Sequence, residues 1–113
     1  MADHIKITPA AAAVTISAGG TTLGTTNKAL ELREGSYGPV LYIPRADVDM
    51  TRLDRTARAS TCPWKGKASY YSIRTDTGTL ENAVWSYEDP LPGVGAIAGH
   101  LAFYADKVTL TRR

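Results

Sequence analysis

The stretch Ala68-Ser69-Tyr70-Tyr71-Ser72-Ile73-Arg74-Thr75 decides the fold, because it combines the aromatic and β-branched residues that strands favour. Asp76-Thr77-Gly78 follows it as a turn, and residues 82–87 supply a returning strand, so the region predicts a β-hairpin. Side chains alternate across a strand, which puts Trp85 and Tyr87 on one face of the second strand. A period of two residues, and not a helical period, therefore organises the centre of the chain.

The same period recurs on both sides of this hairpin. Further strands are expected at residues 14–17 and 21–26 around Gly19-Gly20, and at 29–33, 39–43, 101–104 and 108–110, with 52–59 open between strand and loop. Short helical turns are expected at 44–48, where Pro44 suits the first helical position, and at 94–99. The prediction is a mainly β, single compact domain of about eight short strands, with a core over residues 13–110 and an N-terminal arm over 1–12.

Composition narrows the class of protein. A chain of 113 residues with 43% hydrophobic and 21% charged residues is the size and make-up of one globular domain. The single cysteine, Cys62, excludes a disulfide or a thiolate zinc site within one chain. No metal site and no cofactor are expected. We expect a cytoplasmic protein, because no segment resembles a signal peptide or a membrane span.

Charge argues against a nucleic-acid partner. The chain has 13 basic and 11 acidic residues, and the basic residues of 45–67 are interleaved with acidic ones, a pattern typical of a solvated face.

Four separated segments carry a resemblance to a known family. They are Thr61-Cys62-Pro63-Trp64-Lys65-Gly66-Lys67-Ala68-Ser69-Tyr70-Tyr71-Ser72 and the shorter runs at 42–48, 83–90 and 98–104. In order and spacing they resemble the DUF427 family of small bacterial and fungal proteins. The resemblance implies a compact, tent-like β fold and no established activity, although a nucleotidyltransferase label is sometimes attached to the family.

That label has a formal counterpart in Gly35-Ser36 followed by Asp47-Val48-Asp49. Nucleotidyltransferases use paired carboxylates to hold Mg²⁺ beside a triphosphate. Here Pro39 and Pro44 lie between the two halves, and Asp47 follows a helix-start signal. We therefore interpret the segment as a turn followed by a capped helical turn.

The loop around Cys62 is the most distinctive run. A neighbouring cation such as Lys65 raises the thiolate fraction of a cysteine, so Cys62 is a candidate catalytic nucleophile or redox group. A nucleophile also needs a base, and His100 is the histidine that the fold could bring close. The alternative is a buried and inert thiol.

The aromatic residues suggest a ligand pocket near the Cys62-Pro63-Trp64-Lys65-Gly66 loop. In a small domain most rings fill the core, but a mixture of rings and few charges also makes small-ligand sites. We expect a small polar or anionic ligand, such as a nucleotide or sugar phosphate. The predicted ligand-binding residues are Arg45, Asp47, Lys65, Tyr71, Trp85, Tyr87 and His100.

In this hypothesis Lys65 and Arg45 meet the anion and the rings flank it. Two alternatives stay open: an enzyme that uses Cys62, and an interaction module that pairs through exposed rings and sheet edges. The oligomeric state is left open.

Overall fold

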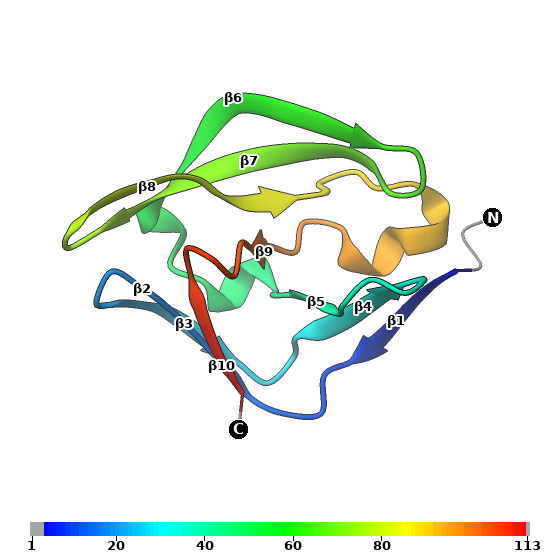
Figure 1. Cartoon of the computed structure of the whole chain (residues 1–113), viewed down its shortest axis with the longest axis horizontal. Coiled ribbons are helices and arrows are strands. Elements are labelled where there is room, and N and C mark those ends of the chain that lie inside the picture. Colours follow the sequence, from blue (N-terminus) through cyan, green and yellow to red (C-terminus); the bar gives the residue numbers. More distant parts are fainter. Residues whose placement is uncertain (1–3, 113) are drawn as a thin grey trace.

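The predicted central hairpin forms strands β7 and β8 of a four-stranded antiparallel sheet (Figure 1). A computed structural model describes residues 4–112, which contain ten strands and three 3-10 turns. The strands are β1 (Ile5–Pro9), β2 (Val14–Ala18), β3 (Thr21–Thr26), β4 (Leu30–Glu34), β5 (Val40–Tyr42), β6 (Leu53–Cys62), β7 (Gly66–Thr75), β8 (Gly78–Ser86), β9 (Ala102–Phe103) and β10 (Thr109–Arg112). The turns are η1 (Arg45–Asp47), η2 (Met50–Arg52) and η3 (Pro92–Ile97).

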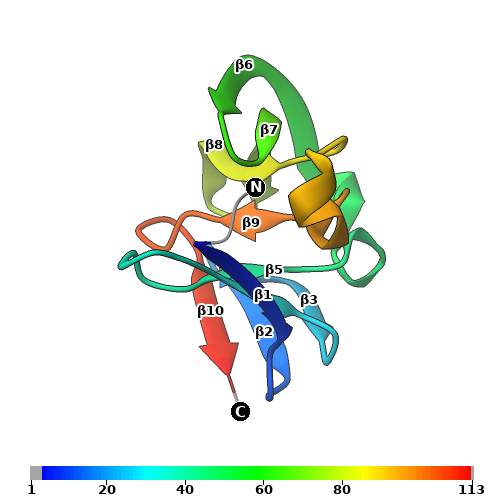
Figure 2. The same ribbon diagram turned by 90° about the vertical axis from the view of Figure 1, so that its right-hand side faces the viewer.

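Three antiparallel sheets build the domain. Their strand orders are β6-β7-β8-β9, β1-β4-β5 and β10-β2-β3. The views in Figures 1 and 2 show the long strands β6, β7 and β8 as a curved upper layer above the other two sheets. An isolated bridge between Ile43 and Leu101, with both backbone N–H···O distances at 2.8 Å, joins the end of β5 to the start of β9.

Residues 68–73 of strand β7 are buried on both faces of the sheet, because their side chains pack into two different apolar clusters. The first core cluster contains Tyr71 and Ile73 and lies towards β2 and β3. The second core cluster contains Ala68 and Tyr70 and lies towards β4 and β5. Alternation along one strand therefore distributes its side chains between two cores.

Most predicted elements are confirmed. The hairpin around Gly19-Gly20 is β2–β3, residues 44–48 contain η1, and residues 94–99 overlap η3. Residues 52–59, left open between strand and loop, lie mostly in β6. This strand lies at the edge of its sheet and exposes most of its side chains, so it shows no alternating apolar pattern.

The N-terminal segment differs from the predicted arm over residues 1–12. Ile5–Pro9 is strand β1, paired with β4 from Ile5↔Glu34 to Pro9↔Leu30, while residues 1–3 lie outside the described part of the chain. The reason is burial: Ile5 and Ile7 pack against the second core cluster. Pairing with β4 also satisfies the backbone groups of β1.

Candidate ligand-binding pocket

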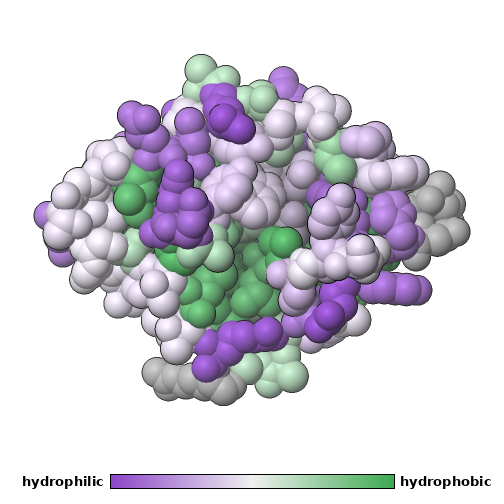
Figure 3. Space-filling model, in the orientation of Figure 1, coloured by the Kyte–Doolittle hydropathy of each residue, from purple (hydrophilic) through white to green (hydrophobic). Residues whose placement is uncertain are grey.

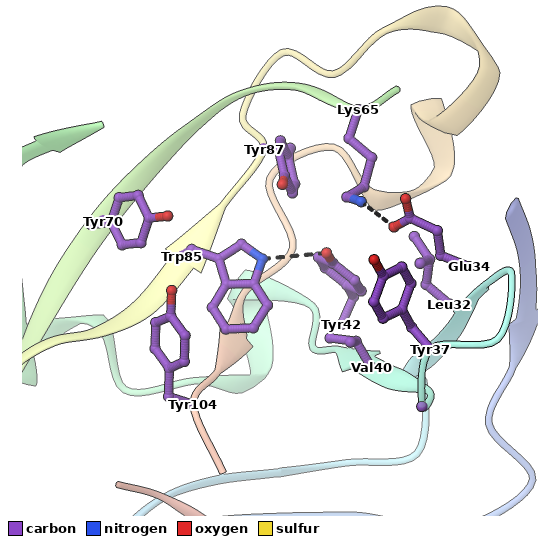
Figure 4. Close-up of a pocket in the computed structure, with 11 residues that line it drawn as sticks. Leu32, Glu34, Tyr37, Val40, Tyr42, Lys65, Tyr70, Trp85, Tyr87 and Tyr104 are labelled. Carbon is purple, nitrogen blue, oxygen red and sulfur yellow. Dashed lines mark hydrogen bonds and ion pairs between the residues drawn. The ribbon is translucent and has the colours of Figure 1, made fainter. Parts of the chain in front are cut away.

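A pocket of about 590 Å³ opens beside the second core cluster, between the upper layer and strands β4 and β5 (Figure 4). Its wall is aromatic, since six of the eleven lining residues in the described chain are tyrosine or tryptophan. The lining residues are Leu32, Glu34, Tyr37, Gly38, Val40, Tyr42, Lys65, Tyr70, Trp85, Tyr87 and Tyr104. A volume of this size suits a small molecule.

Lys65 marks the polar end of the pocket. It is only 8% exposed, and its Nζ donates to Glu34 Oε1 at 2.6 Å. Burial disfavours the charged form of Lys65, but the hydrogen bond and charge of Glu34 outweigh it and raise the pKa of the ammonium. The β6–β7 turn positions this lysine because Gly66, at φ +110°, adopts a backbone conformation that favours glycine.

A histidine ring lies close to the same carboxylate. His4 Nε2 lies 3.6 Å from Glu34 Oε2, and the His4 ring meets the edge of Trp64 at 4.8 Å between centroids. Glu34 thus connects the start of β1 to the turn that carries Lys65. The carboxylate balances the ammonium charge, which leaves this end of the pocket strongly polar.

Trp85 forms the middle of the aromatic wall. Its indole Nε1 donates to the Tyr42 hydroxyl at 3.3 Å, and its ring lies 4.6 Å from the Tyr104 ring at 51°. The Tyr104 hydroxyl points towards Tyr70 of β7 (Figure 4). These contacts hold the indole in one orientation, with a face towards the cavity.

Tyr87 supplies a neutral phenol next to Lys65. Burial raises the pKa of Tyr87 well above its ordinary value, and burial also raises that of Tyr42. Among residues 4–112, no hydrogen-bond partner is found for the Tyr87 hydroxyl, which points into the pocket in Figure 4. A ligand that reaches this end of the pocket therefore meets a free donor and acceptor.

Arg45 and Tyr71 do not line this pocket. Arg45 donates to the Tyr71 hydroxyl at 3.2 Å and to Glu88 Oε2 at 2.9 Å. It also donates to Ser86 Oγ at 3.3 Å and to the Gly99 carbonyl at 3.1 Å. The geometry follows from alternation, because Tyr71 and Ser86 point to the opposite side of the sheet from Tyr70 and Trp85. Arg45 therefore ties η1 and the segment after η3 to the sheet, away from Lys65.

Comparison with known proteins agrees with the resemblance of the four segments. A family model described as a domain of unknown function (DUF427), with the short name NTP_transf_9, matches residues 6–113. The chain belongs to the DUF427 family. No curated protein matches the chain. Within the described residues of this DUF427 domain, no helix has the length and apolarity that a membrane span requires.

The short name of the DUF427 model refers to nucleotidyltransferases, which hold Mg²⁺ with paired carboxylates. In this structure the carboxylates of Asp47 and Asp49 accept hydrogen bonds from protein groups. Asp47 Oδ2 accepts from Thr26 Oγ1 at 2.7 Å. Asp49 caps η2 by accepting from the Thr51 N–H at 3.1 Å, whereas the predicted helical turn at 44–48 is η1, which has no side-chain cap. Over residues 4–112 no group of three or more histidine, cysteine or acidic side chains could hold a metal ion.

Cys62 and His100 also lie outside the pocket lining of the DUF427 domain. Cys62 ends β6 as a half-buried free thiol and packs against the second core cluster. It is near enough to Lys65 and Tyr87 that its negative charge would raise the pKa of both. His100 Nδ1 lies 3.1 Å from the Ala98 carbonyl oxygen, in its own loop.

Of the seven predicted ligand-binding residues, the pocket brings together Lys65, Trp85 and Tyr87. Five further functional candidates were missed: Glu34, Tyr37, Tyr42, Tyr70 and Tyr104. Because side chains alternate along a strand, only one of Tyr70 and Tyr71 can line the pocket. Which of the two does so depends on which face of β7 meets β5. No local pattern identifies Glu34 as the partner of Lys65, because 31 positions separate them.

Proposed function

We propose that this DUF427 domain binds a small polar molecule with a flat ring face in the aromatic pocket. The observation that carries the proposal is the combination of six aromatic side chains with one partly buried ion pair in a cavity of about 590 Å³. Aromatic faces accommodate flat rings, and a few fixed polar groups orient them.

The polar end favours a neutral ligand over an anion. A phosphate or carboxylate that approached Lys65 would also face Glu34, whose charge repels it at close range. Hydroxyl and amide groups meet no such conflict, because they donate to the carboxylate and accept from the ammonium. The Tyr87 hydroxyl offers one more such contact. The expected ligand is therefore neutral and rich in donors and acceptors.

Nuclear magnetic resonance tests this proposal directly, because the chain has two tryptophans in different places. Trp85 lines the pocket and Trp64 is 44% exposed outside it. Titration of ¹⁵N-labelled protein with neutral sugars, nucleosides and cyclic amides should shift the Trp85 indole signal and leave the Trp64 signal in place. If no compound shifts Trp85 at millimolar concentration, the proposal is wrong.

Two tyrosine variants separate binding from folding. Tyr87→Phe removes the free hydroxyl and should weaken a bound ligand about fivefold, the effect of one lost hydrogen bond, with little change in stability. Tyr71→Phe is the matched control outside the pocket. It removes the 2.7 Å hydrogen bond to Glu88, so it should lower stability and leave ligand affinity unchanged. The reverse pattern would place the ligand on the other face of the sheet.

The predicted alternatives, an enzyme based on Cys62 and an interaction module, stay predictions. The described residues place no histidine side chain in hydrogen-bond contact with this thiol.

A further inference from the structure

A second cavity adjoins the aromatic pocket. It has a volume of about 280 Å³ and lies over β5, β9 and β10, where Figure 3 shows an apolar hollow in the middle of the face. Val40, Trp85 and Tyr104 line both cavities. The two cavities therefore adjoin each other, with the Trp85 and Tyr104 rings forming the wall between them.

The two cavities differ in chemistry. The second cavity is lined by the apolar side chains of Leu41, Phe103 and Leu110, together with Pro39 and Ala105. Its one charged lining residue within the described chain is Arg112, which donates to Glu31 at 3.0 Å. The Arg112 guanidinium is already paired with the Glu31 carboxylate. An apolar ligand group in this cavity can therefore contact the apolar side chains without displacing that ion pair.

We propose that the ligand is amphipathic, with its polar ring between Lys65 and Trp85 and a short alkyl or aryl group in the second cavity. This inference rests on the proposed function and names the class of its ligand. The Trp85 and Tyr104 rings separate the two cavities, so the link between the ring and the apolar group passes over their edges. Transfer of the apolar group from water supplies the affinity, and the polar end supplies orientation.

A homologous series of n-alkyl β-glucosides tests the inference, since each member has the same neutral, hydroxyl-rich ring. The series runs from methyl to octyl and is used below micelle-forming concentrations. Affinity, measured from the Trp85 indole signal, should rise about fourfold per methylene until the second cavity is full. A flat dependence on chain length would overturn the inference while leaving the proposed function intact.

Two variants that fill one cavity each show where the alkyl chain and the sugar ring of the ligand bind. Ala105→Phe fills only the second cavity, so it should abolish the chain-length dependence and leave methyl glucoside binding unchanged. Gly38→Phe fills only the first cavity and should weaken all members alike, and a Cβ at Gly38 meets no atom within 4 Å. If the dependence survives Ala105→Phe, the chain lies elsewhere and the inference fails. If no member from methyl to octyl binds the unaltered protein, the inference fails, and the proposed function fails with it only if nucleosides and cyclic amides also leave the Trp85 signal in place.

Discussion

Lys65 is the residue whose removal we expect to cost the most at the pocket. Lys65→Met leaves the Glu34 carboxylate, 21% exposed, without its lysine partner and with the His4 ring 3.6 Å away as its remaining neighbour. Loss of one member of a partly buried ion pair should lower the free energy of unfolding by about 2 kcal/mol. Urea denaturation measures the change, and Lys67→Met on the exposed neighbour is the control, with no change expected beyond about 0.5 kcal/mol.

The double variant Lys65→Met/Glu34→Leu isolates the pair. It removes both charges, so it should recover most of the stability that the single variant loses. A double variant that is less stable than Lys65→Met alone would show that packing of the lysine stem, and not the unpaired carboxylate, explains the loss.

At the scale of elements, β3 lies close against η1 and the residues that follow it. The Asp49 N–H donates to the Leu23 carbonyl at 2.7 Å, and a Cβ on Gly24 would overlap the backbone oxygen of Asp47. Gly24→Ala should therefore lower the free energy of unfolding by about 1–3 kcal/mol, since backbone must move to make room.

Gly38→Ala is the control for this prediction, because the added methyl meets open space at that position. Thermal unfolding of the two variants gives the comparison. Equal melting temperatures for Gly24→Ala and the unaltered protein would mean that η1 moves away from β3 at no cost.

The elements also show why part of the fold was predictable. Strands β7 and β8 were predictable because aromatic and β-branched residues recur along them, and every residue of 68–73 is buried. Apolar and polar residues also alternate in Ile5-Lys6-Ile7-Thr8, so the sequence contains the pattern of strand β1. Strand β6 had none, because an edge strand that faces solvent can carry charged residues at most positions.

The pocket was less predictable than the strands. Alternation correctly pairs Trp85 with Tyr87 on one face, since both line the cavity. Alternation does not reveal which strands cover that face. The sequence therefore could not predict that Tyr42 and Tyr104 line the pocket. The direction of Arg45 depends on Glu88, which is 43 positions away.

The whole molecule should lose stability in acid. In Glu88, burial raises the carboxyl pKa, but Tyr71, Arg45 and Arg55 outweigh burial and hold it below the ordinary value of 4.5. Hydrogen bonds from Arg112 and Thr51 likewise lower the pKa of Glu31 and Asp49, respectively. A lowered folded pKa means that this stability is complete above the unfolded value and is lost as the pH falls through the folded value.

At alkaline pH the shifts are in the opposite direction, because the pKa values of the groups concerned are raised by folding. Burial raises the pKa of Tyr87 and Tyr42 above 10.0, and Glu34 raises that of Lys65 above 10.5. The stability from these groups is complete below the unfolded values and is lost as the pH rises through the folded ones. Urea midpoints should therefore be flat from about pH 5 to pH 9 and fall on both sides.

Tyr87→Phe tests the alkaline limb. The variant removes one raised phenol, so its midpoint should fall less steeply above about pH 10 than that of the unaltered protein. Identical alkaline limbs would contradict a contribution from Tyr87.

The pairing of β10 with β2 also bears on how the domain is made. Thr109 is aligned with Ser17 and Arg112 with Val14, so residues synthesised near the start of the domain wait for those synthesised near its end. During translation one edge of β2 keeps its N–H and C=O groups unpaired until β10 has left the ribosome exit tunnel. Contacts so distant along the chain favour slow closure. Nascent chains that stall before residue 109 therefore carry an open strand edge, which is a template for pairing between chains and a substrate for chaperones.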